Sequence, residues 1–130
     1  MSNEQKINYW LDLSNYDLDT AKAMLETGRY LYVGFMCHQS VEKILKAYFI
    51  KNNNGNPPYT HNLLKLATES GCYNLFNENQ KDLIDQLDPL NIEARYPSYK
   101  EQLLKQLNKE ICSKMFMESK EFLKWISNKL

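Results

Sequence analysis

The sequence predicts an all-α protein that folds as one domain. Apolar side chains recur at intervals of three and four residues over long stretches, which is the period of a helix with one buried face. Gly and Pro number only four each and Val only two, whereas Leu and Lys dominate, so turn signals and strand formers are scarce. We expect an up-and-down bundle of four main helices, at about 4–27, 29–52, 78–92 and 100–129, plus one short helix at about 60–70.

The first two helices are predicted to form a hairpin. The first carries one apolar stripe, spaced by three or four residues, made of Ile7, Leu11, Ser14, Leu18, Ala21 and Leu25. Gly28 then supplies the left-handed residue that commonly follows a helix end. The second helix is apolar on most sides, which indicates a central position. It ends at residues 52–58, Asn-Asn-Asn-Gly-Asn-Pro-Pro, because Asn and Gly tolerate a positive φ and paired prolines cannot continue a helix.

The remaining elements are predicted from caps and breakers. Thr60 has the character of an N-cap for the short helix, and Asn77 can cap the next one, which Pro89 interrupts. Residues 91–99 are predicted to be an ordered loop, because Pro97 disfavours helix at the residue before it. The last segment is predicted to be one long helix whose inner side holds Leu103, Leu104, Leu107, Ile111, Met115, Phe122, Trp125 and Ile126.

Charge is balanced over the chain but not within it. Sixteen basic and sixteen acidic residues give no net charge, which argues against broad, salt-driven coating of nucleic acid. Residues 94–130 nevertheless hold eight basic and four acidic residues, while residues 69–93 hold one and six. A small phosphate-binding cleft near the basic segment therefore stays possible.

Cysteine content and hydropathy bear on the compartment. Three widely spaced cysteines suit reduced, buried thiols better than a disulfide framework or a zinc site. The start of the chain lacks a leader pattern, and the longest apolar run, at 30–37, is too short to span a membrane. We expect a cytoplasmic protein without a membrane partner.

The central helix carries the most unusual polar set. His38 and Glu42 are four residues apart, as are Glu42 and Lys46, so these side chains share one side of the helix with Gln39. In one interpretation, Glu42 and Lys46 form a surface ion pair while His38 is hydrogen-bonded in the core. In the other, they form a polar cluster in a groove of the bundle.

Arg95 and its neighbours are a second candidate. Arg95 is one of two arginines against fourteen lysines, and Arg is the side chain suited to planar recognition of phosphate or carboxylate. Tyr96 and Tyr99 offer aromatic faces that could stack on a base or wedge the loop between helices. The structural alternative is that Arg95 caps a helix end or pairs with an acidic residue.

His61 is a third candidate, at the start of the short helix. It could bind an anion together with free backbone amides, or hydrogen-bond to the preceding loop. No set of residues with metal-ligand spacing accompanies His38 and His61, and the sequence has no Gly-rich phosphate loop and no nucleophile elbow. We therefore predict neither a metal nor a cofactor.

The order of these features resembles the HEPN domain family, a helical bundle named for nucleotide binding in higher eukaryotes and prokaryotes. The resemblance spans nearly the whole chain. It rests on Tyr9-Trp10 with Ala21, Gly28-Arg29-Tyr30, the run from His38 to Ala47, His61-Asn62-Leu63-Leu64-Lys65-Leu66 and Ala94-Arg95-Tyr96-Pro97. It implies a homodimer that pairs along its long helices and often works beside a minimal nucleotidyltransferase, in pairs that look like toxin and antitoxin.

The sequence departs from the family pattern at the ribonuclease motif. Many members cleave RNA without a metal through an Arg followed four to six residues later by His, whereas Arg95 is followed there by Tyr99, Lys100 and Glu101. The usual acid or base for attack by a 2′-hydroxyl is thus missing. By resemblance, Glu42, Gln39, Lys43 or Lys46, and Arg95 would line a shared cleft.

Three functions follow as hypotheses. The first is a homodimeric nucleotide-binding or RNA-binding module, partner of a nucleotidyltransferase, in which Arg95 and Lys46 meet phosphate and Tyr96 or Tyr99 stacks. The second is a divergent metal-independent ribonuclease in which His38, or a tyrosine such as Tyr99, replaces the missing histidine. The third is a purely structural dimerisation module.

Overall fold

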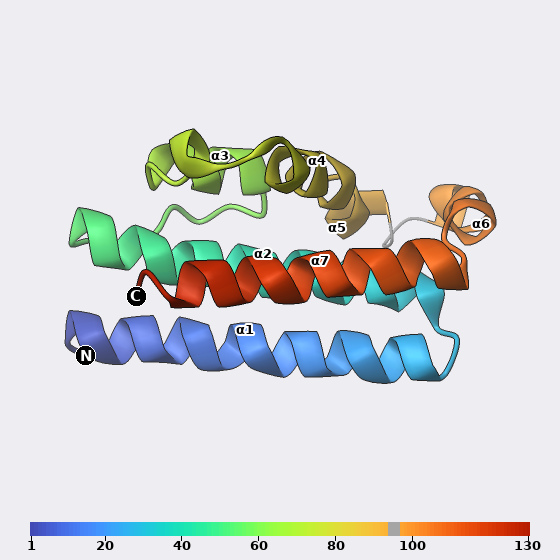
Figure 1. The fold of residues 1–130 in the computed structure, drawn as a ribbon, viewed down its shortest axis with the longest axis horizontal. Helices are drawn as coiled ribbons and strands as arrows, with labels where there is room; N and C mark the ends of the chain where they lie inside the picture. The colour runs from blue at the N-terminus through green and yellow to red at the C-terminus, as the bar shows by residue number, and fades with distance from the viewer. Residues whose placement is uncertain (94–96) are drawn as a thin grey trace.

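Three long helices form the body of the molecule. The computed structural model describes the backbone of residues 1–93 and 97–130 and the side chains of residues 1–91 and 101–130. Helices α1 (Asn3–Glu26), α2 (Tyr30–Asn53) and α7 (Lys109–Ser127) lie side by side, with α1 running opposite to the other two (Figure 1). No strand occurs in the described backbone, so the predicted all-α bundle is confirmed.

Short helices make the return arm between α2 and α7. They are α3 (Leu63–Glu69), the 3₁₀ turn η1 (Tyr73–Leu75), α4 (Glu78–Leu87), α5 (Leu90–Glu93) and α6 (Pro97–Gln106). Helices α3, α4 and α5 lie on the side of α2 and α7 that faces away from α1 (Figure 1). The arm brings the chain back to the end of the bundle at which α7 begins.

The α1–α2 hairpin matches its sequence pattern. Ser14 and Ala21 of the predicted stripe are fully buried, and the Ser14 hydroxyl donates to the carbonyl of Ser40 on α2 at 2.7 Å. Gly28 has a φ of 73°, the left-handed conformation predicted for it. Helix α2 buries fourteen of its 24 residues, which confirms its central position.

The second half of the chain is cut into more pieces than predicted. The expected helix at 100–129 is two helices, because the Asn108 side chain accepts from the Ile111 amide at 2.9 Å and starts α7 afresh. The expected loop at 91–99 instead holds the end of α5 and the start of α6, whose first residue, Pro97, occupies a position where its missing N–H costs nothing.

The boundaries of the middle helices also differ from the prediction. The short helix begins at Leu63, with Asn62 rather than Thr60 as its N-cap, since the Asn62 side chain accepts from the Lys65 amide at 2.9 Å. Helix α4 ends at Leu87, five residues before the predicted end at 92, and Asp88 is its C-cap. Asn77 caps α4 as predicted, in a capping box with Gln80.

The core lies between α2 and its neighbours. Its largest fully buried side chains include Ile44, Leu45, Met115 and Phe122. Gly34 lets α5 approach α2 closely, because a methyl group at that position would lie 2.8 Å from Cδ1 of Leu90. In the described ranges, no helix is both long and apolar enough to cross a bilayer.

The three cysteines are free and buried, in keeping with the packing role predicted for them. Burial raises the pKa of Cys37 and of Cys72 to about 12 and that of Cys112 to about 11. The thiolate, which is the nucleophilic form, is therefore scarce at neutral pH, and these residues are not candidates for reaction chemistry.

Candidate functional site

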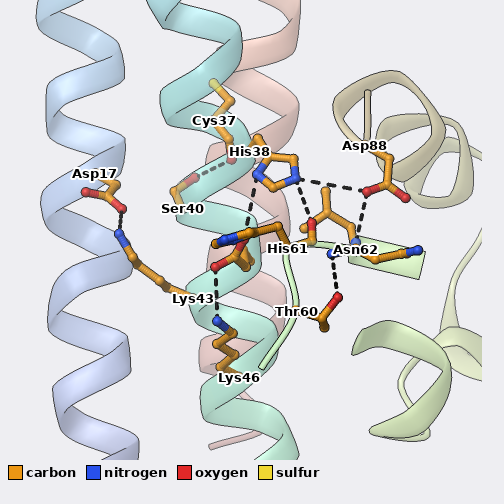
Figure 2. A network of polar contacts seen from close by, with 12 residues as sticks. Asp17, Cys37, His38, Ser40, Lys43, Lys46, Thr60, His61, Asn62 and Asp88 are labelled. Carbon is orange, nitrogen blue, oxygen red and sulfur yellow. Dashed lines mark hydrogen bonds and ion pairs between the residues drawn. The ribbon is translucent and has the colours of Figure 1, made fainter. Parts of the chain in front are cut away.

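A buried carboxylate on α2 organises the polar side chains of the site. Glu42 is 4% exposed at its side chain. Its Oε2 accepts from Lys46 Nζ at 3.1 Å, one helical turn further along, and its Oε1 accepts from His61 Nδ1 at 2.9 Å (Figure 2). Lys46 is itself only 8% exposed, so the predicted ion pair is a buried one, and each charge is desolvated and compensated by the other.

His61 reaches Glu42 from the loop between α2 and α3. The Thr60 hydroxyl accepts from the Asn62 amide at 3.1 Å and fixes the loop on either side of His61. Because a carboxylate only accepts, Nδ1 of His61 carries a proton, and in the neutral ring Nε2 presents a lone pair. The His61 side chain is 49% exposed, so the ring is partly open to solvent.

His38, on α2, contacts the backbone of His61 and is fully buried. Its Nε2 donates to the His61 carbonyl at 3.1 Å, so the imidazole ties α2 to the loop. Burial lowers the pKa of His38, while the charges of Glu42 and Asp88, each 4.0 Å from a ring nitrogen, oppose that shift. Nδ1 of His38 has no hydrogen-bond partner among the described residues. His38 is thus hydrogen-bonded in the core, as in the first interpretation, whereas the Glu42–Lys46 pair of that interpretation is buried and not at the surface.

Asp88, which the sequence did not single out, holds the far side of the site. From the end of α4, its Oδ1 accepts from the Leu63 amide at 2.9 Å and its Oδ2 from the Leu64 amide at 3.4 Å. A carboxylate at this place satisfies free amides of α3 and complements the positive end of the helix. Asp88 thereby fixes α3 against α4 directly beside His61.

Two clefts flank this network. The first, which we call the aromatic cleft, has a volume of about 340 Å³ and is lined by Met1, Lys6, Tyr9, Trp10, Lys46, Asn56, Pro57, Pro58 and Tyr59. The second, the polar cleft, has a volume of about 440 Å³ and is lined by Thr60, His61, Asn62, Asp88, Pro89 and Asn91. The two oxygens of Glu42 thus hold one lining side chain of each cleft, Lys46 and His61.

The polar cleft has an unsatisfied lining group. Asn91 is 3% exposed, and its Oδ1 is buried with no hydrogen-bond partner among the described residues. Buried polar atoms of this kind are uncommon in proteins. Within the described part of the chain, no group of His, Cys, Asp or Glu is placed to share a metal ion.

The structure brings together only part of the predicted site. His38, Glu42, Lys46 and His61 meet, as described above. Gln39 is on α2 but lines neither cleft, and its Oε1 is buried without a hydrogen-bond partner among the described atoms. Lys43, the alternative to Lys46, is paired with Asp17 of α1.

The prediction at Arg95, Tyr96 and Tyr99 cannot be placed relative to the clefts. Arg95 and Tyr96 lie outside the described residues, and only the backbone of Tyr99, in α6, is described.

The lining of the aromatic cleft is the part that sequence reasoning missed. In the sequence, Tyr9 and Trp10 contributed to the family resemblance but were not candidates for a site, and Tyr59 had no predicted role. The signal that could have found them is the loop: two prolines followed by an aromatic residue, with lysines at positions 6 and 46.

The chain is thus a small all-helical domain with a polar network of His38, Glu42 and Lys46 on α2 and His61 on the loop that follows. A sequence model of the HEPN domain matches residues 7–130, and the chain belongs to the HEPN domain family. The fold is similar to that of TT1696 from Thermus thermophilus, whose crystal structure superposes with a TM-score of 0.81 at 20% identity, covering 96% of this chain and 98% of that one. No significant match exists among curated proteins.

Proposed function

We propose that this chain is a homodimeric HEPN-type module that binds a nucleotide or RNA and works beside a minimal nucleotidyltransferase, in a toxin–antitoxin-like or defence pair. The observation that carries the binding role is the buried Glu42–Lys46 pair. It fixes an ammonium group at the wall of a cleft before any ligand arrives, and a preorganised cation is suited to phosphate. Family membership over residues 7–130 supports the same role.

Arg95 is the second phosphate contact of this proposal. It follows Asn91, a lining residue of the polar cleft, by four positions in the sequence. The guanidinium of Arg95 would bind phosphate through two parallel hydrogen bonds, and Tyr96 or Tyr99 would offer a stacking face. Residues 94–130 carry twice as many basic as acidic residues, which favours an anionic partner for this segment of the chain.

Calorimetry tests the binding role. ATP, GTP and a short RNA are titrated into the wild-type protein, Arg95→Ala and Arg29→Ala. The last is a matched control, because Arg29 is the only other arginine and belongs to the turn between α1 and α2. We expect Arg95→Ala to weaken binding by about tenfold or more and Arg29→Ala to leave it unchanged. Absence of binding to all three ligands, or equal affinity of Arg95→Ala and wild type, would contradict the proposal.

A specific observation also favours a second candidate, the divergent ribonuclease. The imidazole of His61, oriented by a carboxylate and half exposed, has the arrangement of a general base, whereas His38 is buried with its Nε2 committed to a carbonyl. His61 Nε2 would take the proton of an RNA 2′-hydroxyl as O2′ bonds to the adjacent phosphorus. The P–O5′ bond then breaks, and the leaving oxygen takes a proton from water.

Incubation of purified protein with RNA tests this candidate. Cleavage should leave a 2′,3′-cyclic phosphate and a 5′-hydroxyl, and His61→Ala should abolish it. His38→Gln, which keeps a donor to the His61 carbonyl, should retain most of it. Equal background cleavage by wild type and His61→Ala would eliminate the enzymatic role of His61.

A further inference from the structure

Three aromatic side chains line the aromatic cleft, and two of them, Tyr9 and Tyr59, are exposed to solvent. The Tyr9 and Trp10 rings meet edge to face with their centroids 5.4 Å apart, and the Tyr9 side chain is half exposed. Tyr59, on the loop across the cleft, is fully exposed. Exposed aromatic residues gathered at one concave place are typical of a surface that a ligand covers.

Two ammonium groups line this cleft, and one of them, that of Lys46, is paired with Glu42. Lys46 Nζ lies 5.1 Å from the centroid of the Trp10 ring, and Glu42 holds it from the inner side. Lys6 Nζ donates to Asn56 Oδ1 at 3.1 Å, so it is held between α1 and the loop that follows α2. No acidic side chain is among the described residues that line the cleft. An anionic group is therefore the partner that its charge favours.

The loop that closes the cleft is held at both ends. On the α1 side, Asn3 Nδ2 donates to Asn54 Oδ1 at 3.2 Å and Lys6 contacts Asn56. On the α2 side, His61 is bound through its ring to Glu42 and through its carbonyl to His38. Pro57 and Pro58 fix their own φ angles between these anchors. A ligand would meet walls that are already in place, which lowers the entropy cost of binding.

We infer that the aromatic cleft binds one nucleotide unit, with the base on the aromatic wall and the phosphate between Lys6 and Lys46. The inference rests on the proposed nucleotide-binding function and gives it a place in the fold. The volume of the aromatic cleft, about 340 Å³, falls within the usual range for a small-ligand site. A purely apolar ligand would use the aromatic wall but bring no negative charge to the two ammonium groups that line the cleft. The unit can come from a free nucleotide or from RNA, since the recognised chemistry is the same.

Trp10 itself can report on this site. The chain has two tryptophans, and Trp125 packs in a separate aromatic group with Phe76 and Phe122. In a Trp125→Phe protein, all tryptophan fluorescence comes from the aromatic cleft. AMP, adenosine, ribose 5-phosphate and a three-nucleotide RNA are titrated into this protein. We expect AMP to change the emission saturably, and adenosine and ribose 5-phosphate each to bind about tenfold more weakly. Tighter binding of the RNA than of AMP would identify RNA as the natural source of the unit.

Two variants and a control locate the contacts. Tyr59→Ser should weaken the binding of AMP by about tenfold, because the base loses a stacking face. Folding should be unaffected, because Tyr59 is fully exposed. Lys46→Met should abolish the phosphate preference, and Lys6→Met gives the same readout if loss of Lys46 unfolds the chain. Lys81→Met is the matched control, since Lys81 lies 5.2 Å from the Tyr73 ring, away from the aromatic cleft. It should bind like the parent protein.

The outcomes separate this inference from the proposed function. If calorimetry shows binding that Arg95→Ala abolishes while Trp10 stays silent, the proposed function stands and the aromatic cleft is not its site. If neither method detects binding, both fail. Equal affinities for adenosine and AMP, or no effect of Tyr59→Ser, would overturn the assignment of the cleft.

Discussion

Glu42 has both a structural and a positioning role. It is buried, it neutralises the buried ammonium of Lys46, and it orients the ring of His61. Its removal would leave an ammonium group in the interior without a counter-charge, and such a charge is far more costly than the intact pair. Function and stability therefore depend on the same carboxylate.

Replacement of Glu42 is expected to reveal this dependence. Glu42→Gln should lower the free energy of unfolding by about 3 kcal/mol or more, because Lys46 is left charged and buried. The double replacement Glu42→Leu with Lys46→Met removes both charges and should recover most of the loss. Urea unfolding followed by circular dichroism measures both.

A surface pair on α7 supplies the control. Lys114 Nζ lies 3.7 Å from Oε1 of Glu118, which follows it by four residues on α7, and the lysine is largely exposed. Glu118→Gln should change the free energy of unfolding by less than about 0.5 kcal/mol. A similarly small effect at Glu42 would mean that its carboxylate is not needed to compensate Lys46.

His38 should make the fold sensitive to acid. Its pKa is lowered in the folded state by burial, so between an unfolded-state pKa of about 6.5 and the lower folded value the unfolded chain binds more protons. Stability contributed by this residue is therefore full above about pH 6.5 and falls as the pH decreases, by at most about 1.4 kcal/mol per pH unit.

Urea midpoints between pH 7 and pH 5 measure this effect. His38→Gln keeps a donor to the His61 carbonyl but cannot titrate, so its midpoint should fall less steeply than that of wild type. His61→Gln is the companion variant and should keep the part of the slope that belongs to His38. Identical slopes for wild type and His38→Gln would contradict the prediction.

The sequence identified part of this site at the level of residues. Spacings of four on α2 placed His38, Glu42 and Lys46 on one side of a helix, and the structure brings all three together. Periodicity could not show that the loop after α2 folds back so that His61 reaches Glu42, because that contact joins residues 19 apart. The same limit hid the aromatic cleft, whose walls come from α1 and from the loop that follows α2.

At the scale of elements, the helix α3 depends on its neighbour. Its seven residues are too few for independent stability, and its first amides are satisfied by Asp88, which belongs to the end of α4. Asp88 therefore connects the start of one helix to the end of the next beside the polar cleft.

Asp88→Ala should loosen α3 locally. We expect a loss of about 1 kcal/mol and faster hydrogen exchange at the amides of Leu63 and Leu64, because both lose their acceptor. Asn77→Ala removes the equivalent cap of α4 and is the control. It should cost a similar amount but leave exchange at Leu63 unchanged, whereas an equal effect of both variants on Leu63 would show that Asp88 acts only through global stability.

Elements were predictable where hydrophobic periodicity is long and unbroken, as in α1 and α2. The errors fall after the end of α2, where side-chain caps decide the boundaries. Asn108 interrupts an apolar pattern that would otherwise continue from α6 into α7, and Asn62 displaces Thr60 as the cap of α3. A cap depends on local backbone geometry as well as residue type, so several Asn, Thr or Ser residues compete for the same role.

At the scale of the whole molecule, the proposed homodimer is the main prediction. Sedimentation equilibrium should give a species of twice the chain mass of 15.4 kDa. The segregation of basic residues into 94–130 and acidic residues into 69–93 favours electrostatic attraction between subunits, so association should weaken as salt is raised. A monomer at all concentrations and salt levels would contradict the homodimer.

The two ends of the chain lie at the same end of the bundle (Figure 1). Asn3, Glu4 and Leu130 line one surface depression, with Asn54 between α2 and the loop as part of the same surface. A short linker from Leu130 to Met1 could therefore close the chain into a ring, which could be reopened at the Gly28 turn. Such a circular permutant would keep every helix in place and yet emerge from the ribosome with α2, the central helix, first.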